Sequence, residues 1–243
     1  MKRHWKKFVG ALVVLIALVV GGSWFYAKVI NKAPAKFSSA DLVAALDKPV
    51  PPPISGAGAA PASSVPHAAN DVSGVWLPAT TSVVRYRVDE SINGFASTAV
   101  GSTNKITGDV TIEGKTVRAA GFTVDTGSFT SDEARRDDQF RGRVMDAAHI
   151  PTATFNITSP IQFASVPADG KTVQIAATGD LMLRGTTKPV TFDLLALRKN
   201  GKIGISGNIP IVFADYGIPN PSFGTIKTDD HGVLEFIVVL QRS

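Results

Sequence analysis

The sequence predicts an all-β domain, folded as a barrel or a sandwich with one short helix, that follows an N-terminal transmembrane helix and a flexible linker. Apolar and polar residues alternate from Thr81 onward, and turn-forming residues separate the alternating runs. Residues 1–36 combine seven basic residues with a long uncharged run. Alternation with period two is typical of strands that bury one face, and many short strands joined by tight turns build barrels or sandwiches.

Residues 1–32 are interpreted as a membrane anchor. The twenty residues from Phe8 to Ala27 carry no charge, and a helix of this length spans roughly 30 Å, the thickness of the hydrocarbon core of a bilayer. Trp24, Phe25 and Tyr26 follow where an interfacial aromatic belt is expected. Four basic residues before the run place the N-terminus in the cytoplasm and the rest of the chain outside. The alternative is a cleaved secretory signal, which would leave a secreted or periplasmic domain.

Residues 33–78 are interpreted as a Pro/Ala/Ser-rich linker. This range has few large apolar residues, and its prolines favour extended conformations. Residues 38–47 could form one or two helical turns, with Ser39 as the N-cap. A flexible coil of about 43 residues spans roughly 36 Å root-mean-square. We therefore expect a tether that holds the following domain away from the membrane.

The charge distribution argues against a nucleic-acid partner. Residues 76–243 contain 17 Lys and Arg against 17 Asp and Glu, so the whole net charge of +5 lies in the first 75 residues. A nucleic-acid-binding domain would be expected to carry a basic face of its own. The absence of cysteine excludes thiol catalysis, thiolate metal sites and disulfides.

The domain at residues 79–243 contains the alternating runs. We expect strands near residues 82–89, 97–103, 105–113, 116–126, 152–159, 172–184, 187–198 and 202–214, and a last strand at 232–242. The turn signals between them are residues 112–115, 167–170, 184–187 and 199–201.

One helical segment interrupts the strands at residues 130–144. Thr130 and Glu133 have the spacing of a capping box, and acidic residues at its start suit the positive end of a helix dipole. We expect this helix to cover one end of a barrel.

Three blocks, in order along the chain, resemble the YceI-like family of polyisoprenoid-binding, lipocalin-like proteins. They are Arg136-Asp137 before the run from Asp146 to Phe155, the hairpin sequence at 183–189, and Asp215-Tyr216-Gly217. The resemblance spans nearly all of residues 82–242. It implies an eight-stranded antiparallel lipocalin-like barrel around a long apolar channel, in a protein of the bacterial envelope that binds isoprenoid or other lipid-like chains.

The chain departs from the family pattern at two places. Phe213 and Ala214 stand where the family often has an arginine before the aspartate–aromatic–glycine step. Val144 and Met145 replace an aromatic pair.

The inward faces of the strands supply the candidate ligand-binding residues, which are Tyr86, Phe122, Phe155, Phe192, Leu194, Phe236 and Val238. The residues alone favour a solidly packed core over a channel, and the family resemblance reverses this preference. Ala177, Gly179 and Gly207 are small and are expected to leave room inside. Arg136, Arg141 and Arg143 are the head-group candidates, because guanidinium groups bind phosphate well; the alternative is that the arginines of this helix pair with its acidic residues. Arg136 and Asp137 are expected to form a structural pair.

These observations predict non-catalytic binding, sequestration or transport of an isoprenoid or similar amphiphilic lipid. No catalytic motif is present, and His231 with Glu235 would make a poor metal site, so no catalytic residue, metal or cofactor is expected. The expected partners are a long-chain lipid and the membrane, with a homodimer left open and no nucleic acid. The alternatives are an envelope protein–protein interaction module with a filled barrel, and a quinone-binding accessory of a membrane redox system.

Overall fold

The computed structural model describes residues 21–22, 33–50 and 71–243. The predicted anchor at residues 1–32 therefore lies outside the described residues except for Gly21 and Gly22. Across the described ranges, no helix combines the length and the apolar character needed to cross a bilayer.

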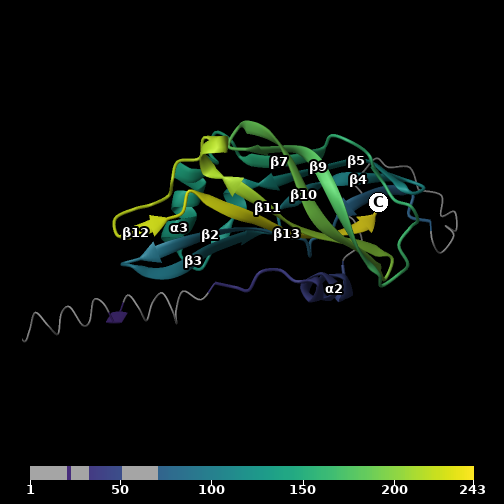
Figure 1. The fold of residues 1–243 in the computed structure, drawn as a ribbon, viewed down its shortest axis with the longest axis horizontal. Helices are drawn as coiled ribbons and strands as arrows, with labels where there is room; N and C mark the ends of the chain where they lie inside the picture. Colours follow the sequence, from purple (N-terminus) through teal and green to yellow (C-terminus); the bar gives the residue numbers. More distant parts are fainter. Residues whose placement is uncertain (1–20, 23–32, 51–70) are drawn as a thin grey trace, which may run out of the picture.

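Thirteen strands, all paired antiparallel, form one continuous sheet (Figure 1). They are β1 (Gly74–Pro78), β2 (Val83–Ile92), β3 (Phe95–Thr103), β4 (Ile106–Glu113), β5 (Thr116–Asp125), β6 (Thr130–Ser131), β7 (Thr152–Ile157), β8 (Ile161–Gln162), β9 (Thr172–Leu183), β10 (Thr186–Lys199), β11 (Lys202–Val212), β12 (Ile226–Thr228) and β13 (His231–Arg242). Within residues 33–50 and 71–243, the α-helices are α2 (Ser39–Asp47) and α3 (Ala134–Gln139).

The sheet closes into a barrel because β13 is long enough to pair with both β1 and β2. Neighbouring strands follow the order β1, β4, β5, β7, β9, β10, β11, β13. The last strand of this order, β13, also pairs with the first, β1, where Trp76 lies opposite Arg242. The other half of β13 pairs with β2, with Val84 opposite Phe236. β1 and β2 are thus the two segments of one interrupted barrel strand, and β3 and β4 are the two segments of the next one. The predicted eight-stranded antiparallel barrel is confirmed.

Tight hairpin turns fix the register of the long strands. Asn200 and Gly201 both have positive φ, 55° and 71°, between β10 and β11. Arg184 and Gly185 do the same between β9 and β10. Two consecutive residues with positive φ are the hallmark of the two-residue turn whose twist matches a hairpin. The predicted turn positions at 184–187 and 199–201 are therefore confirmed.

The predicted helix at 130–144 is shorter and starts later than expected. Thr130 lies in β6, where it pairs with Ser102 of β3, so it cannot cap a helix. Glu133 caps α3 instead, and its side chain accepts a hydrogen bond from the Arg135 backbone at 3.3 Å. After Gln139 the chain continues as a π-helical turn at Phe140–Val144. The helix covers one end of the barrel, called here the α3 end (Figure 1).

The described parts of the predicted flexible linker are ordered and contact the barrel. Residues 74–78 form β1, so the barrel begins before residue 79. Residues 33–50, called the strap from here on, lie along the outside of the barrel below β13 and β2 (Figure 1). Its helix α2 is capped by Ser38, rather than by Ser39, in a capping box with Asp41.

Apolar packing holds the strap in place. Leu42 and Leu46 are completely buried, and with Ala45 they contact a patch on the outer face of the barrel formed by Ala79, Leu197, Ile237 and Val239. Gly204 makes this close approach possible, because a Cβ there would lie 2.7 Å from Leu42 Cδ1. Full burial of one leucine contributes about 1.5–3 kcal/mol, so the docked strap is a stable part of the domain.

A buried ion triad lies under the other half of the strap. Glu235 is fully buried, with its carboxylate 3.2 Å from Arg85 Nε and 2.9 Å from Arg87 Nε. Both guanidinium groups also donate to strap carbonyls, Arg87 to Pro34 at 2.7 Å and Arg85 to Ala35 at 3.2 Å. Phe37 places its ring 3.3 Å from Arg85 Cζ. The strap thus removes from water charges that an ordinary barrel would leave exposed.

We expect Leu46→Ala to loosen the strap. Loss of a fully buried leucine side chain costs about 2–5 kcal/mol, so amide hydrogen exchange in α2 should become at least about 30-fold faster. Ala44→Ser, on the exposed side of the same helix, is the control and should leave exchange nearly unchanged. Equal exchange rates in Leu46→Ala and the control would show that the strap is not held by this packing.

We expect Glu235→Gln to destabilise the barrel by about 3 kcal/mol, because it leaves two buried guanidinium groups without their carboxylate. Glu113→Gln is the matched control, since Glu113 forms an exposed pair with Arg118 at 2.8 Å, and such pairs contribute about 1 kcal/mol at most. The measurement is the free energy of unfolding in urea. A cost for Glu235→Gln no larger than that of Glu113→Gln would contradict this account of the triad.

Candidate functional site: an apolar channel inside the barrel

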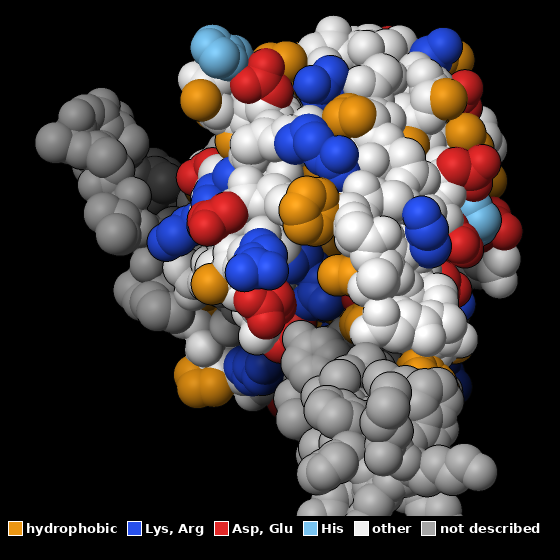
Figure 2. All heavy atoms as spheres, turned by 90° about the vertical axis from the view of Figure 1, so that its left-hand side faces the viewer, with side chains coloured by type: hydrophobic (Ala, Val, Ile, Leu, Met, Phe, Trp, Pro, Cys, Tyr) orange, Lys and Arg blue, Asp and Glu red, His pale blue; other side chains and the backbone are white. Residues whose placement is uncertain are grey.

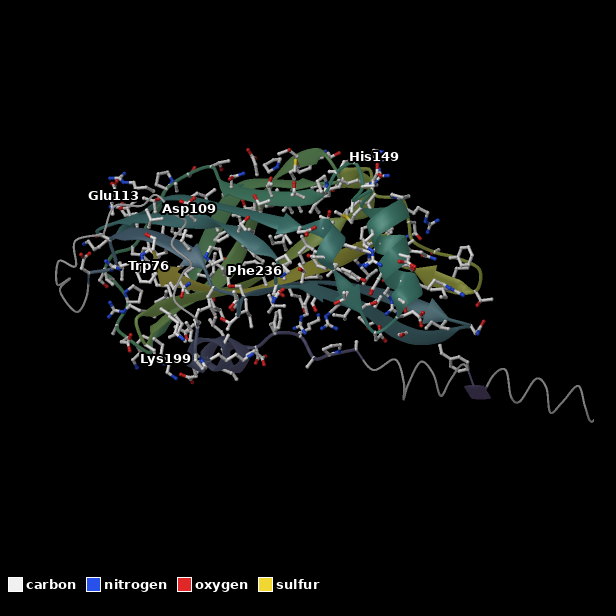
Figure 3. The ribbon with its side chains drawn as sticks, turned by 180° about the vertical axis from the view of Figure 1, so that it is seen from behind. Trp76, Asp109, Glu113, His149, Lys199 and Phe236 are labelled. Atoms are coloured by element: carbon white, nitrogen blue, oxygen red, sulfur yellow. The ribbon has the colours of Figure 1, made fainter. Side chains whose placement is uncertain are left out.

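A cavity of about 320 Å³ occupies the interior of the barrel. This volume lies at the lower end of the range typical of small-molecule sites, about 300–1,000 Å³. All seven predicted ligand-binding residues line it, namely Tyr86, Phe122, Phe155, Phe192, Leu194, Phe236 and Val238. Figure 3 shows Phe236 midway along the barrel, between Trp76 and Glu113 at one end and His149 at the other.

The inward-facing side chains do not fill the interior. Phe122, Phe155, Leu194 and Phe236 point into the barrel, yet each keeps a partly accessible surface. In a solid core of close-packed side chains, residues at these positions would be fully buried. The accessible surface is therefore the wall of a channel.

Aromatic rings line the middle of the channel edge to face. The ring of Phe192 lies 5.5 Å from that of Phe155 and 5.9 Å from that of Phe236, both in edge-on geometry. Such contacts stabilise the rings by about 0.5–1.5 kcal/mol per pair beyond their buried area. The wall is consequently rigid and apolar where a hydrocarbon chain would pass.

The expected room at Gly179 and Gly207 is taken by rings of the wall itself. A Cβ on Gly207 would lie 2.7 Å from Phe236 Cζ, and one on Gly179 would lie 2.5 Å from Phe155 Cζ. Each glycine therefore lets a ring from a neighbouring strand fold back against the wall. Ala177 lines the channel, although its side chain is almost fully buried. The two glycines open the channel indirectly, because the rings that pack against them stay away from its axis.

At the α3 end, a second aromatic cluster lines the channel. Tyr86 stacks on Phe140 with ring centroids 4.6 Å apart, and Phe129 lies 5.0 Å from Phe140. Burial raises the pKa of the Tyr86 hydroxyl above its usual value, so it stays protonated at neutral pH. Phe213, which replaces the family arginine, is also buried and lines this end.

Of the three head-group candidates, the structure brings only Arg136 to the channel. Its Nη2 lies 3.2 Å from Glu90 Oε1, and its Nη1 donates to Asp132. Burial by itself disfavours the charged guanidinium, but Glu90 and Asp132 outweigh it and raise the pKa of Arg136. Arg136 is thus charged, with two carboxylates beside it.

Arg141 and Arg143 do not line the channel, and both have other partners in the structure. Arg141 pairs with Asp138 at 2.7 Å, as the alternative prediction held. Arg143 donates to the carbonyls of Asn220 at 3.0 Å and Ser222 at 3.3 Å.

The expected structural pair of Arg136 with Asp137 is also not formed. Asp137 instead accepts hydrogen bonds from the Ser131 backbone at 2.8 Å and the Ser131 hydroxyl at 2.6 Å. Its role is to hold the start of the helical segment to β6.

Sequence reasoning missed the polar residues at the opposite end of the channel. Lys115 and Arg198 line this end. Lys115 Nζ donates to the Ala164 carbonyl at 3.1 Å, and Arg198 Nε lies 3.6 Å from Asp169 Oδ1. Arg198 continues the inward alternation of Leu194 and Ala196 in β10, so the period-two pattern could have identified it.

The site offers the kind of surface that an apolar chain needs. Its middle offers hydrocarbon and aromatic surface, and its charged side chains lie at the two ends. In the part of the chain that the structure describes, no three His, Asp or Glu side chains are grouped to hold a metal ion. His231 contacts Asp230 at 2.9 Å, and Glu235 contacts Arg85 and Arg87, so these two residues have separate partners.

Two solved structures share the fold. A polyisoprenoid binding domain from Saccharophagus degradans, implicated in plant cell wall breakdown, superposes with a TM-score of 0.58 over 70% of this chain and 99% of its own, at 18% identity. Burkholderia cenocepacia BcnA superposes with a TM-score of 0.51 over 65% of this chain and 95% of its own, at 22% identity.

Curated relatives carry the name UPF0312 protein. The one from Vibrio campbellii is 31% identical over 128 residues, which cover 49% of this chain and 64% of the relative. The one from Pseudomonas paraeruginosa is 33% identical over 103 residues, covering 40% of this chain and 50% of the relative. In both cases the match spans less than two thirds of the relative's own length.

The family model described as the YceI-like domain matches residues 77–240, which include nearly the whole barrel from β1 to β13. With the closed eight-stranded barrel and its apolar channel, this match shows that the chain belongs to the YceI-like domain family.

Proposed function

We propose that this protein binds the chain of an isoprenoid or similar amphiphilic lipid in its channel, without catalysis, and sequesters or carries it in the cell envelope. The observation that carries the proposal is the apolar cavity of about 320 Å³ with its aromatic walls. The name of the Saccharophagus degradans neighbour, a polyisoprenoid binding domain, supports the choice of ligand class.

Simple energetics favour long chains over short ones. Burial of a methylene group contributes about 0.8 kcal/mol, so one five-carbon isoprene unit contributes roughly 4 kcal/mol. Association and ordering cost about 4–15 kcal/mol. Several units must therefore enter the channel before binding becomes tight.

The polar ends impose a weak demand on the head group. Arg136 at the α3 end is already neutralised by Glu90 and Asp132. Lys115 and Arg198 stand at the other end, close to the carbonyl of Ala164 and to Asp169. Length and apolarity of the chain, more than the chemistry of its head, are expected to decide affinity.

The location outside the cytoplasmic membrane is supported by the sequence. The basic residues before the uncharged run at 8–27 favour a single-pass anchor with the barrel on the outer side. The cavity disagrees with the alternative of a filled barrel that serves only as a protein–protein interaction module. For the alternative of a quinone-binding redox accessory, the phenol that the described channel wall offers is the protonated hydroxyl of Tyr86.

We expect the full-length protein, purified from its host without added lipid, to retain a bound apolar molecule. Native mass spectrometry should show a mass above that of the chain, and organic extraction should release a polyprenyl compound. A protein that is ligand-free and also fails to take up added solanesol would contradict the proposed function.

We expect Ala120→Phe to weaken binding by at least about tenfold. Ala120 lines the channel, and a ring there displaces more than the equivalent of two methylene groups of ligand, about 1.6 kcal/mol. Ala119→Phe is the matched control, because Ala119 is exposed on the other face of the same strand. Titrations with farnesol, geranylgeraniol and solanesol should show the loss in the first variant only, and equal affinities for both variants would place the ligand elsewhere.

A further inference from the structure

We propose that the strap fixes the barrel end-on to a bilayer, with the α3 end against the lipid and Phe223 inserted into it. The inference rests on the anchor suggested by the N-terminal sequence.

The path of the strap points to this end. Going backward along the chain, Ala35 lies beside Arg85 and Pro34 beside Arg87, both bonded through their carbonyls. The strap therefore approaches residue 33 in the direction in which β2 runs toward Ile92. From Arg87 to Ile92 there are five residues, which cover about 17 Å at the rise of a strand.

The remaining connection to the anchor is short. The uncharged run ends at Ala27, so residues 28–33 are the only link between it and the docked part of the strap. Six residues reach at most about 20 Å. The chain would thus bring the end of the barrel at Ile92 to the bilayer surface, in contrast to the long flexible tether that composition predicts.

An exposed aromatic side chain lies at this end. Phe223 is 61% exposed, more than Val212 at 48% or Val75 at 39%, the other large apolar residues exposed in the described chain. It bridges to Ile226, which pairs in turn with Ile92 at the end of β2. Phenylalanine is among the side chains that bury into the boundary between headgroups and acyl chains, where its apolar ring leaves water.

The loop that carries Phe223 is held firmly by hydrogen bonds. Arg143 donates to the carbonyls of Asn220 and Ser222. The Ser222 hydroxyl accepts from the Thr228 backbone at 2.8 Å, and Asn220 donates to the Thr228 carbonyl at 3.0 Å. A ring on a fixed support loses little conformational freedom when it enters lipid.

The same loop forms part of the channel wall. Ile218, Pro221 and Thr228 line the cavity, while Phe223 points to solvent. Figure 2 faces this end of the barrel and shows apolar side chains among both basic and acidic ones. The mixture of charges gives no strongly basic surface, so the contact we propose is apolar and does not require anionic lipid.

Single-cysteine labels test the orientation directly, because the chain has no cysteine of its own. Full-length Phe223→Cys and Ala168→Cys, each carrying an environment-sensitive fluorophore, are placed in phosphatidylcholine vesicles that contain a lipid-borne quencher. Ala168 is exposed in the loop before β9, at the opposite end. Quenching several-fold stronger at position 223 than at 168 is expected, and equal or reversed quenching would overturn the proposal.

Two further variants separate the roles of Phe223 and the strap. With the label moved to Thr225→Cys, adding Phe223→Ser should reduce quenching, and no change would exclude an anchoring role for the ring. Leu42→Asp with Leu46→Asp should undock the strap and abolish the difference between positions 223 and 168. Persistence of that difference would show that the strap does not orient the barrel. If the stronger quenching at position 223 appeared only with phosphatidylglycerol in the vesicles, the contact would be electrostatic, and the proposed apolar insertion would be wrong.

Failure of this proposal can be told apart from failure of the proposed function. Solanesol binding is measured on the same labelled samples, and retained binding also shows that the doubly substituted strap variant is folded. Lipid binding without oriented quenching would reject only the membrane contact.

Discussion

The hollow interior depends on the way two phenylalanine rings pack against glycines of neighbouring strands. Phe236 lies over Gly207, and Phe155 lies over Gly179, at distances that no Cβ would permit. Larger residues at the two glycines would push these rings toward the axis, where Phe192 already contacts both of them edge-on. The closed sheet provides the enclosure, and the glycines decide that the enclosed volume becomes a channel instead of a solid core.

Much of the fold follows from local patterns in the sequence. Alternation in β2, β9, β10, β11 and β13 and the turn pairs such as Asn200-Gly201 are local signals, and the structure agrees with them. The strap was missed because its stability comes from tertiary packing on an outer face. Leu194 to Leu197 and Phe236 to Leu240 break the alternation with continuous apolar runs. Such runs indicate strands buried on both faces, and here the second face lies under α2.

The channel residues were predictable for the same reason, since the side-chain period of a strand is two residues and one inward position determines the next. The positions of the arginine side chains in the helical segment could not be predicted in this way. The length of the helix and the start of the π-helical turn decide where Arg141 and Arg143 point. Arg136 reaches the channel but meets Glu90, a partner more than forty residues away in sequence. Ion pairs between residues so far apart in sequence depend on how the sheet closes, and no local sequence pattern predicts them.

The narrow bore has a consequence for selectivity. Bulk phospholipids carry two acyl tails, and a cavity near the lower limit of ligand-site volumes favours a single slender chain over such a pair. The membrane anchor that we propose would place the barrel beside these two-tailed molecules, which are abundant at a bilayer. The ring-lined wall would exclude phospholipids because two acyl tails side by side are too wide. The interior would then remain available for a scarcer lipid with a single thin, linear chain.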